Sequence, residues 1–206
     1  MSTLKDTLKE GRFVVTSEVG PPKGTDIHKL MEEAEILRNK VIAINVTDIQ
    51  SAVMRLGSMA VCHLLKEKGL EPVFQMVCRD RNRLALQSDL LSASVLGIEN
   101  VLCLTGDYPT LGDHPQTKPV YDLDSVQLLA AAKGLCEGQD MAGNALEGKP
   151  DFFLGAVVTP GTDPVEPQII KMEKKIKVGA QFFQTQAVYE VDKFAIFMEK
   201  VKHFGV

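Results

Sequence analysis

The sequence predicts a parallel α/β protein, and within that class a (β/α)8 TIM barrel of which about six βα units are present. Short runs rich in β-branched residues alternate along the chain with amphipathic stretches of helical periodicity. The runs begin 28, 31, 28, 52 and 29 residues apart, and all but one interval is close to the length of one βα unit. Such regular alternation is typical of parallel strands that are each followed by a helix.

Six strands are expected, in order, at residues 13–19, 41–47, 72–78, 100–106, 152–159 and 181–186. The stretch 26–40 shows the helical pattern, with one apolar face formed by Ile27, Leu30, Met31, Ala34 and Leu37. The final residues, 194–206, are expected to form the sixth helix and the first step of a seventh strand. A complete barrel needs eight units and typically about 250 residues. We therefore expect a single domain over residues 1–206 that lacks its last two βα units.

An open, doubly wound sheet is the competing architecture, and it usually carries a glycine-rich phosphate-binding turn after its first strand. Here the first turn reads EVGPPKG, and its two prolines remove backbone N–H donors that a phosphate cradle would use. Neither GxGxxG nor GxxxxGK[ST] occurs anywhere in the chain. The barrel is therefore the favoured fold.

The composition narrows the class of ligand. The 206 residues carry a net charge of −4, which gives no basic footprint for nucleic acid, so a small molecule is the expected ligand. No apolar run approaches the roughly 20 residues of a membrane span, and the first residues do not read as a leader. We expect a cytoplasmic protein. The cysteines show neither paired nor metal-finger spacing, which predicts buried reduced thiols and no metal site at Cys62, Cys78, Cys103 and Cys136.

Polar residues at the carboxyl ends of parallel strands converge on one mouth of a barrel. The expected strands place there Glu18, Thr47, Asp48, Gln75, Asp107, Thr159 and Gln186. Glu18 is flanked by Val15, Val19 and Pro21, so we expect a desolvated carboxyl with a raised pKa, suited to general acid catalysis. Asp107 could serve catalysis or cap the next helix. The amide of Gln186 suits the donor and acceptor edge of a heterocycle, or a bond within the barrel.

Together these residues form a recognisable pattern. The segments SEVGPP, LTGD, KPVYDLDSVQLL and KKIKVGAQFFQTQ, in this order and spacing, resemble the methylenetetrahydrofolate reductase family of flavin-dependent (β/α)8 barrels. The resemblance covers roughly residues 12–204. The stretch CRDRNRLALQSDLL at 78–91 is similar to a divergent branch of the family found in anaerobic folate metabolism.

The resemblance implies a reaction and roles for residues. The family reduces 5,10-methylenetetrahydrofolate to 5-methyltetrahydrofolate, a step in one-carbon metabolism and methionine biosynthesis, with hydride from reduced flavin. Its acid, which protonates N10 of the folate, falls on Glu18; its aspartate beside flavin and pterin falls on Asp107; its pterin-binding glutamine falls on Gln186. Family positions that contact the flavin fall on Thr47, Gln75, Leu104, Thr105, Gly106, Tyr121, Thr159, Lys174 and Lys175. FAD is favoured over FMN.

The chain also departs from the family pattern. Val19 and Gly20 stand where phenylalanines are usual, and Thr105 and Gln75 replace a common arginine and a common histidine. Thr159 and Asp163 replace a common tyrosine and histidine. These changes fall on the flavin's tail and the pocket walls, so both FAD and FMN remain open.

Partners follow from the same resemblance. The electron donor is expected to be NAD(P)H, stacking on the flavin in the folate's place, or an electron-donating partner subunit, and we expect an oligomer or complex. The third strand is followed by an arginine tract, formed by Arg79, Arg81 and Arg83. We expect this tract to be a solvated loop; a partner surface and an anion contact are the alternatives.

Two other functions stay open on the sequence. One is a pterin-binding barrel that transfers methyl groups to a corrinoid protein, since such barrels also need Asp and Gln at strand ends. The other is a catalytically idle folate-binding subunit of a larger complex. A reductase would contain bound flavin, whereas the methyltransferase would not. A reductase would also turn over its substrate, whereas the idle subunit would not.

Overall fold

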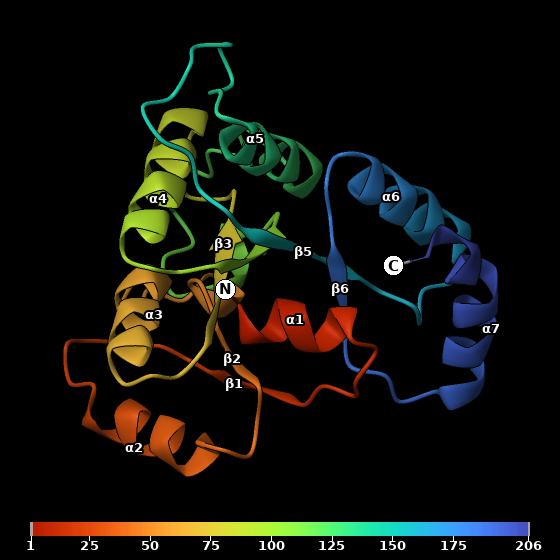
Figure 1. The fold of residues 1–206 in the computed structure, drawn as a ribbon, viewed down its shortest axis with the longest axis horizontal. Coiled ribbons are helices and arrows are strands. Elements are labelled where there is room, and N and C mark those ends of the chain that lie inside the picture. The colour runs from red at the N-terminus through yellow and green to blue at the C-terminus, as the bar shows by residue number, and fades with distance from the viewer. Residues whose placement is uncertain (1, 206) are drawn as a thin grey trace.

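The computed structural model describes residues 2–205 and shows one six-stranded parallel sheet in the order β1-β2-β3-β4-β5-β6 (Figure 1). The strands are β1 (Thr16–Val19), β2 (Ala43–Val46), β3 (Pro72–Val77), β4 (Asn100–Leu104), β5 (Phe153–Val158) and β6 (Phe182–Thr185). Each strand pairs with its sequence neighbour, for example Glu18 with Asn45 and Gln75 with Leu102. The expected fold class is confirmed: the sheet curls into an incomplete barrel whose described strands β1 and β6 do not pair with each other.

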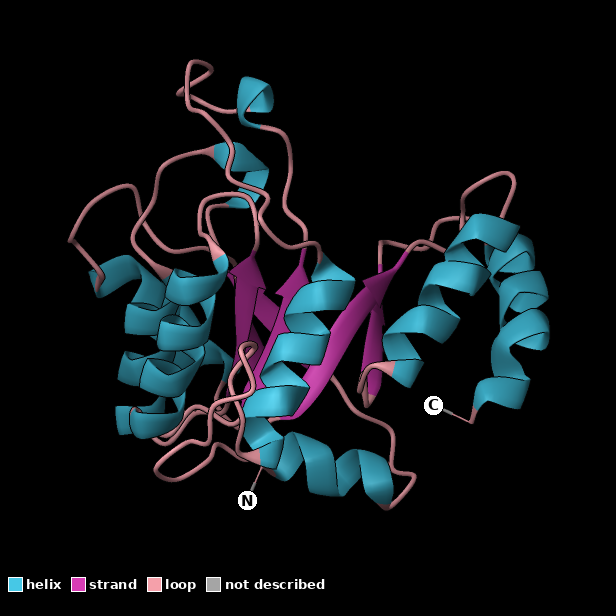
Figure 2. Ribbon diagram, turned by 90° about the horizontal axis from the view of Figure 1, so that it is seen from above, coloured by secondary structure: helices cyan, strands magenta, loops and turns pink. Residues whose placement is uncertain are grey.

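Helices follow the strands and pack on the outside of the curled sheet. They are α2 (His28–Leu37), α3 (Ser58–Glu67), α4 (Arg83–Val95), α5 (Ser125–Glu137), α6 (Glu166–Lys177) and α7 (Val191–Val201). The long loops after the strands gather at one end of the sheet, with the short 3-10 helices η1 (Gln50–Ala52) and η2 (Pro109–Leu111), as Figure 2 shows. This end is the carboxyl end of every strand, so a shared site is expected there.

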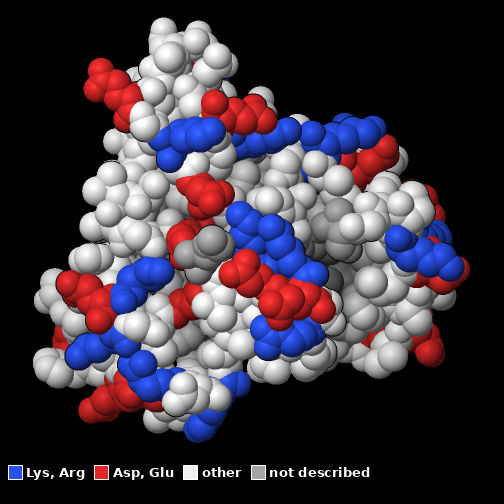
Figure 3. Space-filling model, viewed as in Figure 1, with Lys and Arg blue, Asp and Glu red and all other residues white. Residues whose placement is uncertain are grey.

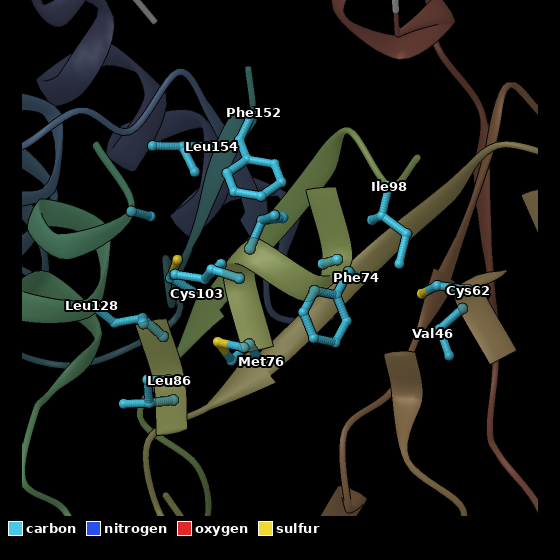
Figure 4. Close-up of a cluster of buried hydrophobic side chains, with 14 of the residues drawn as sticks. Val46, Cys62, Phe74, Met76, Leu86, Ile98, Cys103, Leu128, Phe152 and Leu154 are labelled. Atoms are coloured by element: carbon cyan, nitrogen blue, oxygen red, sulfur yellow. The ribbon is translucent and has the colours of Figure 1, made fainter. Parts of the chain in front are cut away.

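Side chains alternate between the two faces of each strand, which produces an outer and an inner core, and a third cluster joins Val158 of β5 to Met172 of α6 and Phe197 of α7. Outward-facing residues such as Val46, Phe74 and Met76 pack against the helices, as seen in Figure 4. Inward-facing residues such as Val73, Leu102 and Phe153 form a smaller cluster inside the barrel. Because strands buried on both faces need apolar residues on both, the near-continuous apolar runs of the sequence are explained.

A short helix lies at the opposite end of the barrel. This helix, α1 (Thr3–Lys9), was not expected from the sequence, and its Leu4 joins the inner cluster at 2% exposure. The Glu71 carboxylate accepts hydrogen bonds from the backbone N–H groups of Thr3 and Leu4, each at 2.9 Å. Open space remains at both ends: one cavity opens toward the loops, and another of about 670 Å³ lies beside α1, between the inner face of the sheet and α7. Both acidic and basic side chains are spread over the α1 side of the molecule (Figure 3).

The end of the chain departs from expectation. Residues 191–201 form α7, the helix expected after β6, but residues Lys202–Phe204 form a 3-10 helix, η3, rather than the start of a seventh strand. Gly205 follows in the left-handed region at φ 69°, a conformation that ends extended structure. The expected step at Val206 lies outside the described residues.

Candidate functional site

A cavity of about 500 Å³ opens at the carboxyl ends of the strands. Most of the residues expected to carry function line this one cavity: Glu18, Thr47, Gln75, Leu104, Thr105, Gly106, Asp107, Thr159, Lys175 and Gln186. The other two, Tyr121 and Lys174, line an adjoining groove of about 670 Å³ that shares Thr105 and Gly106 with the cavity. The parallel topology thus brings together residues that lie far apart in sequence.

Glu18 lies inside the barrel mouth but is not desolvated. Its side chain is exposed on β1, and Val15 is 48% exposed, so the expected apolar surround is wrong for this structure. The reason is that β1 is an edge strand, with a paired neighbour on only one side. The Gln75 amide donates a long hydrogen bond of 3.4 Å to the Glu18 carboxylate, which links β3 to β1 across the mouth.

Thr47, at the end of β2, is buried at 3% exposure, and its hydroxyl has no hydrogen-bond partner within the described part of the chain. A buried hydroxyl without a partner is costly, and at a cavity wall it is available to a ligand. Thr105 differs, because its hydroxyl accepts a 3.3 Å hydrogen bond from the Ser125 N–H at the start of α5. The Thr105 hydroxyl can still donate its own hydrogen to a ligand, whereas the Thr47 hydroxyl has both its donor and its acceptor sites open.

Asp107 follows β4 and is exposed at the cavity, with its backbone held from behind. The Asp107 carbonyl accepts hydrogen bonds from the Tyr121 hydroxyl at 3.0 Å and from the Arg79 guanidinium at 3.2 Å. Gly106 precedes it at φ 95°, and a Cβ there would lie 3.1 Å from side-chain atoms of Val77 and Arg79. Only glycine fits this turn, which is why the Gly-Asp pair stands at the strand end. Within residues 2–205, the carboxylate itself has no hydrogen-bond or ion-pair partner and is open to a ligand.

Lys175 on α6 is buried at 6% exposure at the cavity wall, and its ammonium donates to the Val157 carbonyl. Burial lowers the pKa of this amine to about 8, with Lys171 adding repulsion and Asp124 opposing it. Lys174, the next residue, is exposed and faces the adjoining groove. The two adjacent lysines therefore serve different surfaces, and Lys175 is a cation held without a carboxylate partner among the described residues.

The adjoining groove is aromatic on one side. Tyr108 and Tyr121 stack with ring centroids 6.1 Å apart and an interplanar angle of 28°. Lys174 lines the same groove, together with Asp124 and Gln127. A flat ring with an anionic tail would suit this combination of aromatic faces and a cation.

The arginine tract is not the solvated loop that was expected. Arg79 is buried at 1% exposure, and its guanidinium forms a two-point contact with the Asp80 carboxylate. Arg81 binds the fully buried carboxylate of Asp48 at 2.7 Å and also Asp89 at 2.9 Å. Only Arg83, which pairs with Asp122 at 2.8 Å, is exposed as predicted.

Several cavity residues were missed at the level of sequence. Gln168 and Lys171 lie seven and four positions before Lys175 on one face of α6, and all three line the cavity. Gln184 and Thr185 of β6 also line it. The helical spacing was visible in the sequence, but it did not say that this face of α6 turns toward the barrel mouth.

Three of the four cysteines are buried as expected, and the fourth is not. Cys62, Cys78 and Cys103 are buried and free, and Cys136 is half-buried. Burial raises the pKa of Cys78 to about 12. Within residues 2–205, no helix combines the length and apolar character needed to span a bilayer.

Comparisons of the sequence with family models and with curated proteins point to the same family. A family model described as methylenetetrahydrofolate reductase matches residues 3–206. A 5,10-methylenetetrahydrofolate reductase from Pectobacterium carotovorum subsp. carotovorum is 24% identical over 214 residues, which cover 98% of this chain and 64% of the relative. The chain thus spans about two thirds of the length of that relative.

Solved structures show the same fold. An uncharacterized protein from Clostridium thermocellum that binds two copies of 5-methyl-5,6,7,8-tetrahydrofolic acid has a TM-score of 0.64 at 16% identity, over 98% of this chain and 64% of its own. A 2,3-dimethylmalate lyase of the PEP mutase/isocitrate lyase superfamily has a TM-score of 0.62 at 11% identity, over 96% of this chain and 67% of its own. At such identities the likeness concerns the fold alone.

Proposed function

The chain belongs to the methylenetetrahydrofolate reductase family, and on that basis we propose that it reduces 5,10-methylenetetrahydrofolate to 5-methyltetrahydrofolate with a bound flavin. The observation that carries the proposal is the convergence of Glu18, Gln75, Asp107 and Gln186 on one cavity. A proton donor, two amides and a free carboxylate there match what a pterin and its one-carbon bridge need.

The residues present fit a flavin. The unpartnered hydroxyl of Thr47 and the amide of Gln75 offer polar contacts inside the cavity, as the edge of a flavin ring requires. The groove beside it, with Tyr121 and Lys174, would hold the tail, and Lys175 supplies a cation at the wall of the cavity. When bound, the flavin supplies the hydride. We propose FAD rather than FMN, because the groove extends the cavity beyond Gly106.

Glu18 is the proposed proton donor to N10 of the folate. Its carboxyl is exposed in the free protein, so a folate lying over the mouth would itself exclude water from it. The 3.4 Å contact with the Gln75 amide orients the Glu18 carboxyl toward the cavity. Asp107 and Gln186, which follow β4 and β6, would orient the pterin by accepting and donating hydrogen bonds.

A folate-binding protein without reductase activity is a second candidate. It is supported by the similarity to the Clostridium thermocellum protein described by its binding of 5-methyltetrahydrofolic acid. The exposure of Glu18 also suits this reading, since the free protein does not provide the desolvated carboxyl expected of a buried general acid. The two candidates differ in whether flavin is bound and whether the folate is turned over.

The test uses purified protein reconstituted with FAD. For the reductase, we expect flavin absorbance to remain with the protein after gel filtration and the reduced flavin to be reoxidised by 5,10-methylenetetrahydrofolate. Glu18→Gln should slow this reoxidation by about 10² to 10⁴-fold, because the amide cannot donate the proton, and leave reduction of the flavin by dithionite unchanged. Glu32→Gln, at an exposed position on α2, is the matched control. Binding of 5-methyltetrahydrofolate by a colourless protein with no turnover would instead establish the folate-binding candidate.

A further inference from the structure

Arg79 is a fully buried arginine that no part of the proposed chemistry uses. It follows the end of β3 by two residues, and its side chain is 2% exposed. Its backbone carbonyl accepts a 2.7 Å hydrogen bond from the Val120 N–H, which fixes the main chain at this point. A buried guanidinium is expensive to desolvate unless its donors are satisfied. Its partners therefore indicate its role.

The guanidinium joins three loops of the barrel mouth. One terminal nitrogen donates to the Asp107 carbonyl of the loop after β4, at 3.2 Å, and the other donates to the Ile49 carbonyl of the loop after β2, at 3.1 Å. Nε and the second nitrogen also bind the two oxygens of Asp80, at 2.8 and 2.7 Å, in the loop after β3. Both loops that Arg79 reaches line the cavity, through Asp107 and through Ile49.

The loop after β2 has a backbone that needs such support. Ile49, Ser51 and Ala52 all have positive φ, at 47°, 54° and 57°. For a β-branched residue such as Ile49 this conformation is a genuine outlier, and each such residue costs on the order of 1 kcal/mol or more. Ile49, Gln50 and Ser51 form one wall of the cavity. A strained segment persists only where its surroundings hold it, and the Ile49 carbonyl is held by Arg79.

We propose that Arg79 is a positioning residue: its guanidinium ties the loops after β2 and β4 into one arrangement and so presents the Asp107 carboxylate to the ligand. The tie between the loops rests on geometry alone. The effect on folate rests on the proposed function of Asp107.

The contacts indicate that the role of Arg79 is geometric and not a matter of charge. Asp80 lies against the guanidinium and neutralises it locally, so Arg79 adds little net field at the cavity. What an arginine supplies here is a planar fork whose donors reach two carbonyls and a carboxylate at once. A lysine at position 79 would keep the charge but could not make all of these contacts.

The first measurement is amide hydrogen exchange on the protein without ligand. The variants are Arg79→Lys and Arg79→Met, and the matched control is Arg83→Lys, which removes a similar two-point contact with Asp122 at an exposed position of the same tract. We expect exchange in residues 49–56 and 105–112 to speed up together by about tenfold in both Arg79 variants and to stay unchanged in the control. If Arg79→Lys leaves either segment protected, the tie is overturned. Thermal unfolding is measured in parallel to identify a variant that has lost its fold. If Arg79→Met is unfolded, the exchange rates of Arg79→Lys alone test the proposal.

The second measurement is a double-mutant cycle on binding of 5-methyltetrahydrofolate by calorimetry. If Arg79 acts through Asp107, Arg79→Lys should weaken binding about tenfold in the parent and have little effect in the Asp107→Asn background. Equal losses in both backgrounds would refute the presentation of Asp107 and leave Arg79 a stabilising residue. A parent protein that does not bind this folate would refute the proposed function instead, while the exchange result on the loops would stand independently.

Discussion

The buried lysine of α6 gives a stability prediction whose sign depends on pH. In the folded chain the pKa of Lys175 falls from 10.5 to about 8, chiefly through burial. At about 1.4 kcal/mol per unit, charging the amine inside the protein costs about 3 kcal/mol. Replacing Lys175 by Met removes that cost but also the hydrogen bond to the Val157 carbonyl, worth about 1 kcal/mol. At pH 7 we therefore expect Lys175→Met to raise the free energy of unfolding by about 2 kcal/mol.

The pH dependence follows from proton counting. Below pH 8 the amine is charged in both states, so the full cost is present. Between pH 8 and pH 10.5 the unfolded chain holds more protons on Lys175 than the folded protein does, so the stability of the parent rises with pH relative to the variant. The difference should shrink across this window and reverse near its upper end, where only the lost hydrogen bond remains.

The assay is urea denaturation of both proteins at pH 7, 8, 9 and 10. Lys174→Met is the control, because this neighbouring lysine is exposed and should give a small difference that does not vary with pH. A Lys175→Met variant that is less stable than the parent at pH 7, or a difference that does not change with pH, would refute the reasoning. A buried lysine that lowers the stability of the folded protein is consistent with a role of Lys175 in binding an anion.

Three further substitutions probe the site. Asp107→Asn should leave the flavin bound and the fold intact but lower folate turnover by about 10- to 100-fold, measured by steady-state kinetics, because it removes a charged hydrogen-bond acceptor. Gly106→Ala should lower the free energy of unfolding by about 1 to 3 kcal/mol in urea, since φ is 95° and the added carbon meets Val77. Asp48→Asn should cost about 3 to 5 kcal/mol in the same assay, because it leaves the Arg81 guanidinium partly unpaired. Loss of turnover without loss of stability in Asp48→Asn would contradict that assignment.

The strands could be predicted because parallel strands buried on both faces must be apolar throughout. Their ends could not, since apolar content alone does not show where pairing begins. Phe13 and Val15 belong to the expected first strand, yet Phe13 is 93% exposed and β1 begins only at Thr16. Within residues 2–205, β1 pairs only with β2, and its other edge is not paired with a strand.

The candidate site was predictable where topology alone decides position. Strand ends converge whatever the side chains are, and Gln75, Asp107 and Gln186 accordingly share the cavity. The buried cations were not predictable, because a lysine or arginine in a polar run has the same local sequence whether it is solvated or buried. The burial of Lys175 depends on which face of α6 turns inward, and that of Arg79 depends on carbonyls supplied by two distant loops.

Two aspartates, Asp48 after β2 and Asp107 after β4, differ in their partners, and the difference distinguishes structural support from binding. Asp48 is buried with both carboxylate oxygens occupied: Arg81 binds each of them, and the Val77 N–H adds a third donor at 2.9 Å. Asp107 has the opposite arrangement, with its backbone carbonyl held by two donors and its carboxylate free at the cavity. The Asp48 carboxylate is engaged by three donors of the fold itself, so a ligand there would compete with Arg81 and Val77, whereas a carboxylate held only through its backbone is open to a ligand. Asp48 therefore stabilises the structure around the cavity, and Asp107 is the aspartate available to bind a ligand in it.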